Sequence, residues 1–373
     1  MPEKFDYYLP TDIYFGQGSL KLLKELAGSG QNVLLVTGRS FLRKSGWLRK
    51  VKSLLKGNKV FVFDQVAANP DLATVEQGLA LVRKHRINLV VGVGGGSVLD
   101  CAKAIAILAR NKGKVIDYLD KRSLIKRPGL KYIAVPTTAG SSSEVTPYSV
   151  ITVRDRGLKI TLAHKYMFPS VALIEPAFLS SLPPAQVANP GIDVLCHAME
   201  AYWNVNHNPI SDICALQAIK LVVISLPRLF KDRKSRSSQT EMAWASLFAG
   251  LAFSNTRTTA CHSISYPLTT IFGVPHGQAC AITLPEMLIF NAGSVKDRAK
   301  DLCAALGAKN VAAAAKMIRQ LMKQIGLKSK LSELGIKQAD LSIIMDKGYT
   351  PERMGNNPRK ISRSEMAEIL KRS

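Results

Sequence analysis

The chain has 373 residues, 47% hydrophobic and 21% charged, which is typical of a globular protein with room for two domains. Lysine and arginine outnumber aspartate and glutamate by 51 to 27, so the formal net charge is +24 and anionic partners are favoured. With no uninterrupted apolar run of about 18 residues, no signal-peptide core and no Cys-x-x-Cys pair, we expect a cytoplasmic protein without a membrane span or a thiolate zinc site.

Short apolar runs alternate with helical patterns in the first half of the chain. Strands are predicted over 33–37, 60–63, 89–93 and 132–136, and helices over 72–84 and 97–109. This alternation predicts an α/β domain with a parallel sheet and helices on both faces.

The second half is almost wholly helical. Pro183-Pro184 and Asn189-Pro190-Gly191 punctuate the chain before this part. We therefore place a domain boundary near residue 181. Helices are predicted over 192–205, 210–223, 241–253, 258–268 and 310–325.

A glycine turn joins the predicted strand 89–93 to the next helix. Gly94, Gly95, Gly96 and Ser97 would put free N–H groups at a helix N-terminus, where the helix dipole favours a pyrophosphate. Ser97 and Asp100 also have the spacing of a capping box. Because the segment lacks the G-x-G-x-x-G fingerprint, a tight turn without a ligand is the alternative.

Two further segments follow predicted strands. The segment 136–146 is dense in hydroxyls and could bind phosphate and ribose, or form a simple Ser/Thr turn. After the first strand, Gly38, Arg39 and Ser40 stand where an acidic residue would bind a ribose 2′-hydroxyl, and they leave room and donors for a 2′-phosphate. We predict a preference for NADPH over NADH.

Four residues of the helical half suit a divalent metal. Asp193 and His197 lie four positions apart and project from one face of a predicted helix. His262 and His276 are fourteen positions apart and need a bend between two elements to converge. Three imidazoles and a carboxylate leave a ligand position open for a substrate oxygen, although each histidine alone could be a core or surface residue. These ligand types do not choose among iron, zinc, manganese, cobalt and nickel.

Together these motifs resemble the iron-containing (group III) alcohol dehydrogenases over nearly the whole chain. The segments that carry the resemblance are 94–100, 136–140, 191–202 and 275–277. It implies a dehydroquinate synthase-like fold, with a dinucleotide-binding α/β domain over 1–180 and an all-helical metal- and substrate-binding domain over 181–373, and a homodimer. The implied metal ligands, for iron(II) first with zinc or manganese as alternatives, are Asp193, His197, His262 and His276. The residues implied to line NADPH or NADH are Gly38, Ser40, Asn69, Gly94, Gly95, Gly96, Ser97, Asp100, Thr137, Thr138, Ser141, Lys159 and Leu179.

Two residues depart from the family pattern. Many relatives carry a second histidine four residues after the first C-terminal ligand, where this chain has Tyr266. Tyr266 could orient the substrate or relay a proton, or pack as an ordinary aromatic. Arg257 stands where many relatives have an uncharged residue. It could pair bidentately with a phosphonate, phosphate or sulfonate, or extend to the surface.

Short segments around His262 and after Glu200 most resemble the phosphonoacetaldehyde reductase branch. We therefore expect NADPH-dependent reduction of phosphonoacetaldehyde to 2-hydroxyethylphosphonate, with Arg257 binding the anionic tail and Tyr266 or water protonating the alkoxide. The alternatives are a reductase of sulfoacetaldehyde or of neutral short-chain aldehydes and, from another class, a basic polyanion-binding protein on an inactive enzyme fold. No aromatic residues interleave a basic stripe, so no specific nucleic-acid partner is expected.

Overall fold

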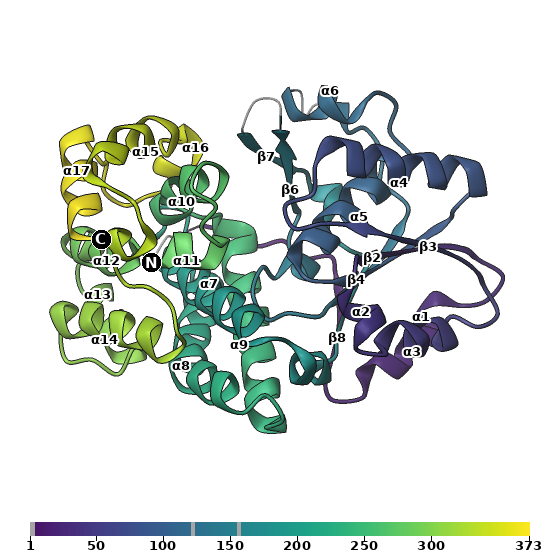
Figure 1. Cartoon of the computed structure of the whole chain (residues 1–373), viewed down its shortest axis with the longest axis horizontal. Coiled ribbons are helices and arrows are strands. Elements are labelled where there is room, and N and C mark those ends of the chain that lie inside the picture. Colours follow the sequence, from purple (N-terminus) through teal and green to yellow (C-terminus); the bar gives the residue numbers. More distant parts are fainter. Residues whose placement is uncertain (1–3, 121–123, 155–157) are drawn as a thin grey trace. The chain divides into compact units, whose positions relative to one another are not determined.

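The computed structural model describes residues 4–120, 124–154 and 158–373, which form two compact units (Figure 1). We call Leu9–Thr138 with Ser142–Ser181 the sheet unit. We call Leu182–Ser373, with Ala139–Ser141 and the described N-terminal residues up to Tyr8, the helical unit.

The sheet unit is built on parallel strands. In the part of the chain that the structure describes, six strands pair in the order β1-β8-β5-β4-β2-β3. Runs such as Val33–Val36 are apolar throughout because both faces of the sheet are covered. The strands are β1 (Asp12–Phe15), β2 (Asn32–Gly38), β3 (Lys59–Val66), β4 (Leu89–Gly94), β5 (Lys131–Pro136) and β8 (Val171–Ile174).

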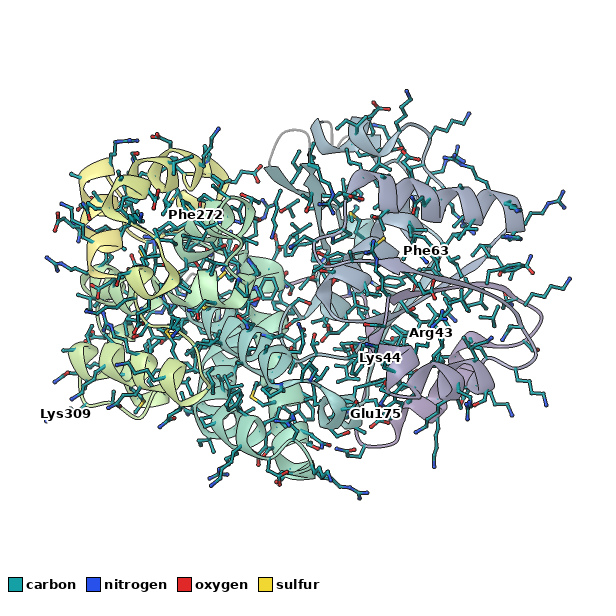
Figure 2. All side chains as sticks on the ribbon, viewed as in Figure 1. Arg43, Lys44, Phe63, Glu175, Phe272 and Lys309 are labelled. Carbon is teal, nitrogen blue, oxygen red and sulfur yellow. The ribbon has the colours of Figure 1, made fainter. Side chains whose placement is uncertain are left out.

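Helices lie on both faces of this sheet, as predicted. Helices α4 and α5 pack on the face that receives Leu34, Val90 and Phe63, the last labelled in Figure 2. Val33 and Val91 point to the other face, where α1 and α3 contribute to the core. The helices of the unit are α1 (Leu23–Ala27), α2 (Phe41–Lys44), α3 (Trp47–Leu54), α4 (Leu72–His85), α5 (Gly96–Leu108) and α6 (Val115–Asp120), with 3-10 turns at Ser19–Leu22, Ser143–Val145, Lys165–Met167 and Pro176–Ser181.

An antiparallel hairpin of β6 (Tyr148–Val153) and β7 (Leu158–Ala163) was not predicted from the sequence. It is tied to α5 by Asp100, whose carboxylate accepts hydrogen bonds from Ser143 Oγ at 2.7 Å and Val150 N at 2.9 Å. The capping box predicted for Ser97 and Asp100 is therefore wrong. The helix starts at Gly96 with Gly95 as its N-cap, and the Asp100 side chain serves the hairpin instead.

The helical unit contains the elements that follow residue 181. Its helices are α7 (Pro184–Trp203), α8 (Pro209–Lys231), α9 (Arg236–Thr256), α10 (Ala260–Thr270), α11 (His276–Ala281), α12 (Leu284–Val295), α13 (Arg298–Ala305), α14 (Val311–Gln324), α15 (Leu341–Lys347), α16 (Pro351–Met354) and α17 (Arg363–Arg372), with 3-10 turns at Leu331–Leu334 and Gln338–Asp340. The five helices predicted in this half are all present.

The helix predicted from residue 192 begins earlier than expected, because α7 starts at Pro184 and continues through Asn189-Pro190-Gly191. A proline removes one helical hydrogen bond, but packing against neighbouring helices can compensate. Here α7 packs closely on α8: a Cβ on Gly191 would lie 2.3 Å from Leu226 Cδ1.

Among the described residues, α8 alone is long and apolar enough to cross a membrane by length and composition. It packs against α7 and α9, and buries Ala215, Ile219, Val222 and Leu226. Core helices of globular units pass the same length and composition test, so α8 is only weak evidence of a membrane span.

Candidate active site

Most of the predicted cofactor residues follow the carboxyl ends of neighbouring strands. Gly38 ends β2, Gly94 ends β4, and Thr137 follows β5 with its N–H donating to Gly94 O at 3.0 Å. The strand order changes direction between β2 and β4, because β3 lies on the other side of β2. Open α/β sheets bind ligands at such a switch point, beyond the carboxyl ends of the strands.

The glycine turn lies at this switch point. A Cβ on Gly94 would stand 2.5 Å from Val98 Cβ, so only glycine allows α5 to start this close to β4. The first N–H groups of α5 are left without helical partners and can receive a phosphate. Ser97 Oγ accepts a hydrogen bond from Asn69 N at 3.1 Å, and Thr138 Oγ1 lies 3.3 Å from where a Gly95 Cβ would be.

The other predicted cofactor residues are spread over several elements. Ser40 is exposed just before α2, and Leu179 is buried in the turn Pro176–Ser181. Lys159 lies on β7. Burial raises the pKa of Asp100, and the positive charge of Lys159 offsets part of this rise. Ser141 belongs to the helical unit.

The predicted metal ligands converge inside the helical unit. Donor atoms of Asp193, His262, His276 and Cys280 all lie within 4.8 Å of one another. His197, the fourth predicted ligand, is beside them: its Nε2 is 2.9 Å from His262 Nε2, and its Nδ1 is 4.0 Å from an Asp193 carboxylate oxygen. The structure thus brings all four predicted ligands together and adds a thiol.

Three helices hold this cluster. Helix α7 carries Asp193 and His197, α10 carries His262, and α11 begins at His276. The sequence-based expectation of a bend between the last two elements agrees with a left-handed Gly273 (φ +69°). Helix α11 packs directly on α7, since a Cβ on Gly277 would lie 1.8 Å from Asn189 O.

Glu200 binds the Nδ1 side of the His262 ring, and the sequence analysis gave it no role. It is fully buried, and its carboxylate accepts from His262 Nδ1, Thr259 Oγ1 at 2.7 Å and Cys261 N at 2.8 Å. A carboxylate on Nδ1 fixes the imidazole tautomer that leaves Nε2 to the metal. Glu200 lies seven residues after Asp193, on the same face of the helix, and this spacing could have identified it from the sequence.

The pKa values of the clustered groups shift in different directions. Burial lowers the pKa of His197 to about 4, so this imidazole is neutral near pH 7 and can act as a ligand. Burial raises the pKa of Asp193, but the neighbouring His197 and His276 lower it more, so the carboxylate is ionised. Burial lowers the pKa of His262, but the neighbouring Cys280 and Glu200 outweigh it and raise the pKa, so this imidazole has to release a proton when it binds a cation.

The residues present fit a divalent metal. Asp193 Oδ1 and His197 Nδ1 are buried and have no hydrogen-bond partner in the described part of the chain. Buried polar atoms are rarely left so, and a cation among these donors would satisfy the carboxylate. Cys280 Sγ lies 3.8 Å from both ring nitrogens of His276. Burial raises the pKa of Cys280, which favours the thiol, so the expectation that the protein has no thiolate zinc site stays a prediction.

The two predicted catalytic residues differ in their surroundings. Tyr266 is half-buried on α10, one turn after His262, and the guanidinium carbon of Arg353 lies 4.7 Å from the centre of its ring. Arg257 is exposed at the end of α9 with φ +68°, and its carbonyl accepts hydrogen bonds from Asn204 and Thr256. The sequence analysis overlooked Arg353, because no local pattern relates it to Tyr266.

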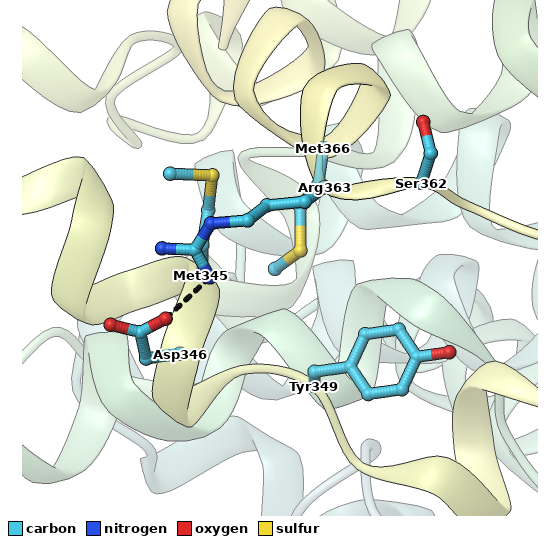
Figure 3. A pocket seen from close by; sticks show the side chains of 6 residues that line it. All are labelled: Met345, Asp346, Tyr349, Ser362, Arg363 and Met366. Carbon is cyan, nitrogen blue, oxygen red and sulfur yellow. Dashed lines mark hydrogen bonds and ion pairs between the residues drawn. The ribbon is translucent and has the colours of Figure 1, made fainter.

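The helical unit has a pocket that does not involve these residues. A pocket of about 230 Å³ lies between α15 and α17, and two of its lining residues, Arg363 and Asp346, form an ion pair at 2.5 Å (Figure 3). The pocket is lined by Met345, Asp346, Tyr349, Ser362, Arg363 and Met366, so none of the predicted site residues lines it.

Family models match both parts of the chain. The model for iron-containing alcohol dehydrogenase matches residues 10–176, and the C-terminal model of the Fe-containing alcohol dehydrogenase family matches residues 187–373. The chain belongs to the iron-containing alcohol dehydrogenase family. As a member, it is an NAD(P)-dependent oxidoreductase acting on CH–OH groups, and its metal-ligand cluster agrees with the metal in the family name.

Similar proteins span nearly the full length. Alcohol dehydrogenase 4 of Schizosaccharomyces pombe is 35% identical, over 98% of this chain and 88% of that protein. The NADPH-dependent butanol dehydrogenase of Clostridium saccharobutylicum is 32% identical, over 98% of this chain and 96% of that protein. The crystal structure of sulfoacetaldehyde reductase from Bifidobacterium kashiwanohense in complex with NAD+ has a TM-score of 0.93 at 33% identity, over 99% of this chain and 98% of that one.

Proposed function

We propose that this dehydrogenase reduces a small aldehyde with an anionic tail, phosphonoacetaldehyde first, to the corresponding alcohol, 2-hydroxyethylphosphonate. The observation that carries the proposal is its likeness, over 99% of its length, to a reductase of sulfoacetaldehyde, an aldehyde with a sulfonate tail. The net charge of +24 favours the same class of substrate.

The residues have distinct roles in this proposal. Asp193, His197, His262 and His276 would hold the metal, and Glu200 keeps His262 in the ligand tautomer. When bound, the metal and the nicotinamide would supply a Lewis acid for the aldehyde oxygen and a hydride for its carbon. The tail pairs with a cation of the chain, for which the sequence suggests Arg257. The proton for the alkoxide comes from the Tyr266 hydroxyl or from water.

We propose NADPH as the preferred cofactor and the turn after β2 as the reason. Gly38 offers no carboxylate to a ribose 2′-hydroxyl, and Arg39 is an exposed cation beside it. The homodimer implied by the family resemblance is a further proposal. Light scattering after size-exclusion chromatography would test it, and a monomer mass would refute it.

The decisive experiment is NADPH oxidation by metal-loaded protein with phosphonoacetaldehyde, sulfoacetaldehyde and butanal in parallel. We expect kcat/KM to be highest for phosphonoacetaldehyde, and metal-free protein is the control. If kcat/KM is highest for sulfoacetaldehyde, the substrate is still an aldehyde with an anionic tail, but it is not phosphonoacetaldehyde.

A neutral short-chain aldehyde is the second candidate substrate, because the chain is 32% identical to a butanol dehydrogenase. Highest kcat/KM for butanal would favour it. Salt-sensitive nucleic-acid binding without turnover of any aldehyde would favour a polyanion-binding protein instead.

A further inference from the structure

A second arginine contacts Tyr266, one of the two predicted catalytic residues. The Arg353 guanidinium carbon is 4.7 Å from the centre of the Tyr266 ring, and Arg353 is half-buried on α16. Tyr266 shares a face of α10 with His262, because the two residues are four positions apart. Because Arg353 contacts Tyr266, it lies on the side of α10 that carries the metal ligand His262.

The backbone before Arg353 is fixed to the helix that carries His262. Ser263, the residue after His262, donates from Oγ to Gly348 O at 2.6 Å. The same hydroxyl accepts from Thr350 N at 2.8 Å. Ser263 is fully buried, so these bonds are shielded from water.

The backbone after Arg353 is fixed in the same way. Asn356 Nδ2 donates to Thr258 O at 3.0 Å, just before α10, and Asn356 O accepts from Val205 N at 3.0 Å, just after α7. Arg353 is thus held on both sides by residues next to the helices that carry Asp193, His197 and His262. A cation whose backbone is fixed and whose guanidinium stacks on Tyr266 needs less reordering to bind an anion.

We propose that Arg353 binds the anionic tail of the aldehyde and determines specificity for it, an inference that rests on the proposed function. Stacking on the Tyr266 ring uses the face of the guanidinium, and bidentate pairing with a phosphonate or sulfonate uses its edge. Tyr266 positions Arg353 in this arrangement. Arg257, in contrast, is exposed at a helix end.

The test compares Arg353→Leu, Arg353→Lys, Arg257→Leu and Arg363→Leu with the parent enzyme, metal-loaded and with saturating NADPH. The readout is the ratio of kcat/KM for phosphonoacetaldehyde to kcat/KM for butanal. Losing a charge-assisted contact should lower this ratio about 10- to 100-fold in Arg353→Leu, mainly through KM. Arg353→Lys should recover part of it. Arg363→Leu removes an exposed arginine of the same unit and should leave the ratio at the parent value.

A binding measurement separates recognition from turnover. Ethylphosphonate, which has the anionic tail but no aldehyde, should inhibit the parent competitively and should lose about 10-fold or more in inhibition constant with Arg353→Leu. If circular dichroism shows that Arg353→Leu does not fold, Arg353→Lys replaces it in both measurements. Its effect should be smaller, because lysine keeps the positive charge and loses only the planar guanidinium.

The outcomes distinguish the two proposals. If the parent prefers phosphonoacetaldehyde but both Arg353 variants keep the parent ratio and inhibition constant, the role of Arg353 is overturned and the proposed function stands. If the kcat/KM ratio falls in Arg257→Leu and in no other variant, Arg257 is the residue that binds the anionic tail. A parent that prefers butanal and is not inhibited by ethylphosphonate would overturn the proposed function and this inference together.

Discussion

Among single residues, Glu200 holds one of the metal ligands, His262, in place. Its carboxylate is fully buried and accepts hydrogen bonds from His262 and from the backbone that starts α10. Glu200→Gln retains the shape but removes the charge that keeps the Nδ1 proton in place. We expect metal affinity to fall about 10- to 100-fold, measured by competition with a chelator.

Glu241→Gln is the matched control for this prediction. Glu241 lies on α9 of the same unit, and its carboxylate accepts from Ser225 Oγ at 2.6 Å. It should leave metal affinity at the parent value. If Glu200→Gln binds metal as tightly as the parent does, Glu200 does not orient His262 for the metal.

At the scale of elements, the turn after β2 sets the expected cofactor preference. A Cβ on Gly38 would lie 3.6 Å from Val98 Cγ2 and 3.7 Å from Val66 O, which are ordinary contacts, so the backbone here accepts a side chain. An aspartate carboxylate would repel a 2′-phosphate and accept from a 2′-hydroxyl. Gly38→Asp should lower the NADPH-to-NADH ratio of kcat/KM at least about 10-fold, corresponding to about 1.4 kcal/mol.

Ser40→Ala serves as the comparison for Gly38→Asp. It removes a hydroxyl donor without adding charge, and should lower the ratio less. An unchanged ratio in Gly38→Asp would place the 2′-phosphate away from this turn, and an NADH preference in the parent would refute the cofactor proposal itself.

The loop between β5 and β6 contains a buried acid, which gives the sheet unit a pH dependence. Burial raises the pKa of Glu144 from 4.5 to about 7, although Lys103 lowers it in part. The folded state thus holds a proton that the unfolded chain has lost between these pH values. Its stabilising contribution is complete below pH 4.5 and is lost as pH rises through 7.

Glu144→Gln cannot ionise, so its stability should rise relative to the parent between pH 4.5 and 7, by at most about 3 kcal/mol. Denaturant unfolding across this range measures the difference. Glu25→Gln, at an exposed position on α1, should show almost none of it. A constant difference between Glu144→Gln and the parent would mean that Glu144 is ionised in the folded protein throughout.

The elements predicted correctly are those with strong local patterns. The apolar run of β4 and the periodic helix α4 needed no knowledge of distant contacts. The β6–β7 hairpin was missed because the two strands form only by pairing with each other and by the hydrogen bond from Val150 N to Asp100. The same holds in the site. Asp193 and His197 show helical spacing, whereas Arg353 reaches Tyr266 only through the tertiary fold.

At the scale of the whole molecule, the excess of positive charge should act on the rate of encounter with anionic substrates. Lysine and arginine side chains extend from the surfaces of both units in Figure 2, and the net charge is +24. Such a field attracts anions over a distance set by the ionic strength, about 30 Å at 0.01 M and about 8 Å at 0.15 M. With NADPH saturating, kcat/KM for phosphonoacetaldehyde should therefore fall several-fold over this range.

Butanal provides the internal comparison, because a neutral aldehyde is not steered by charge and its kcat/KM should change little with salt. The Arg353→Leu variant separates the long-range field from the local contact: its kcat/KM for phosphonoacetaldehyde should start lower than that of the parent but keep most of the salt dependence, since it removes one charge of the 51 lysines and arginines. Equal salt dependence for phosphonoacetaldehyde and butanal in the parent would show that the positive charge does not speed substrate capture. The basic surface would then need another explanation than the anionic substrate.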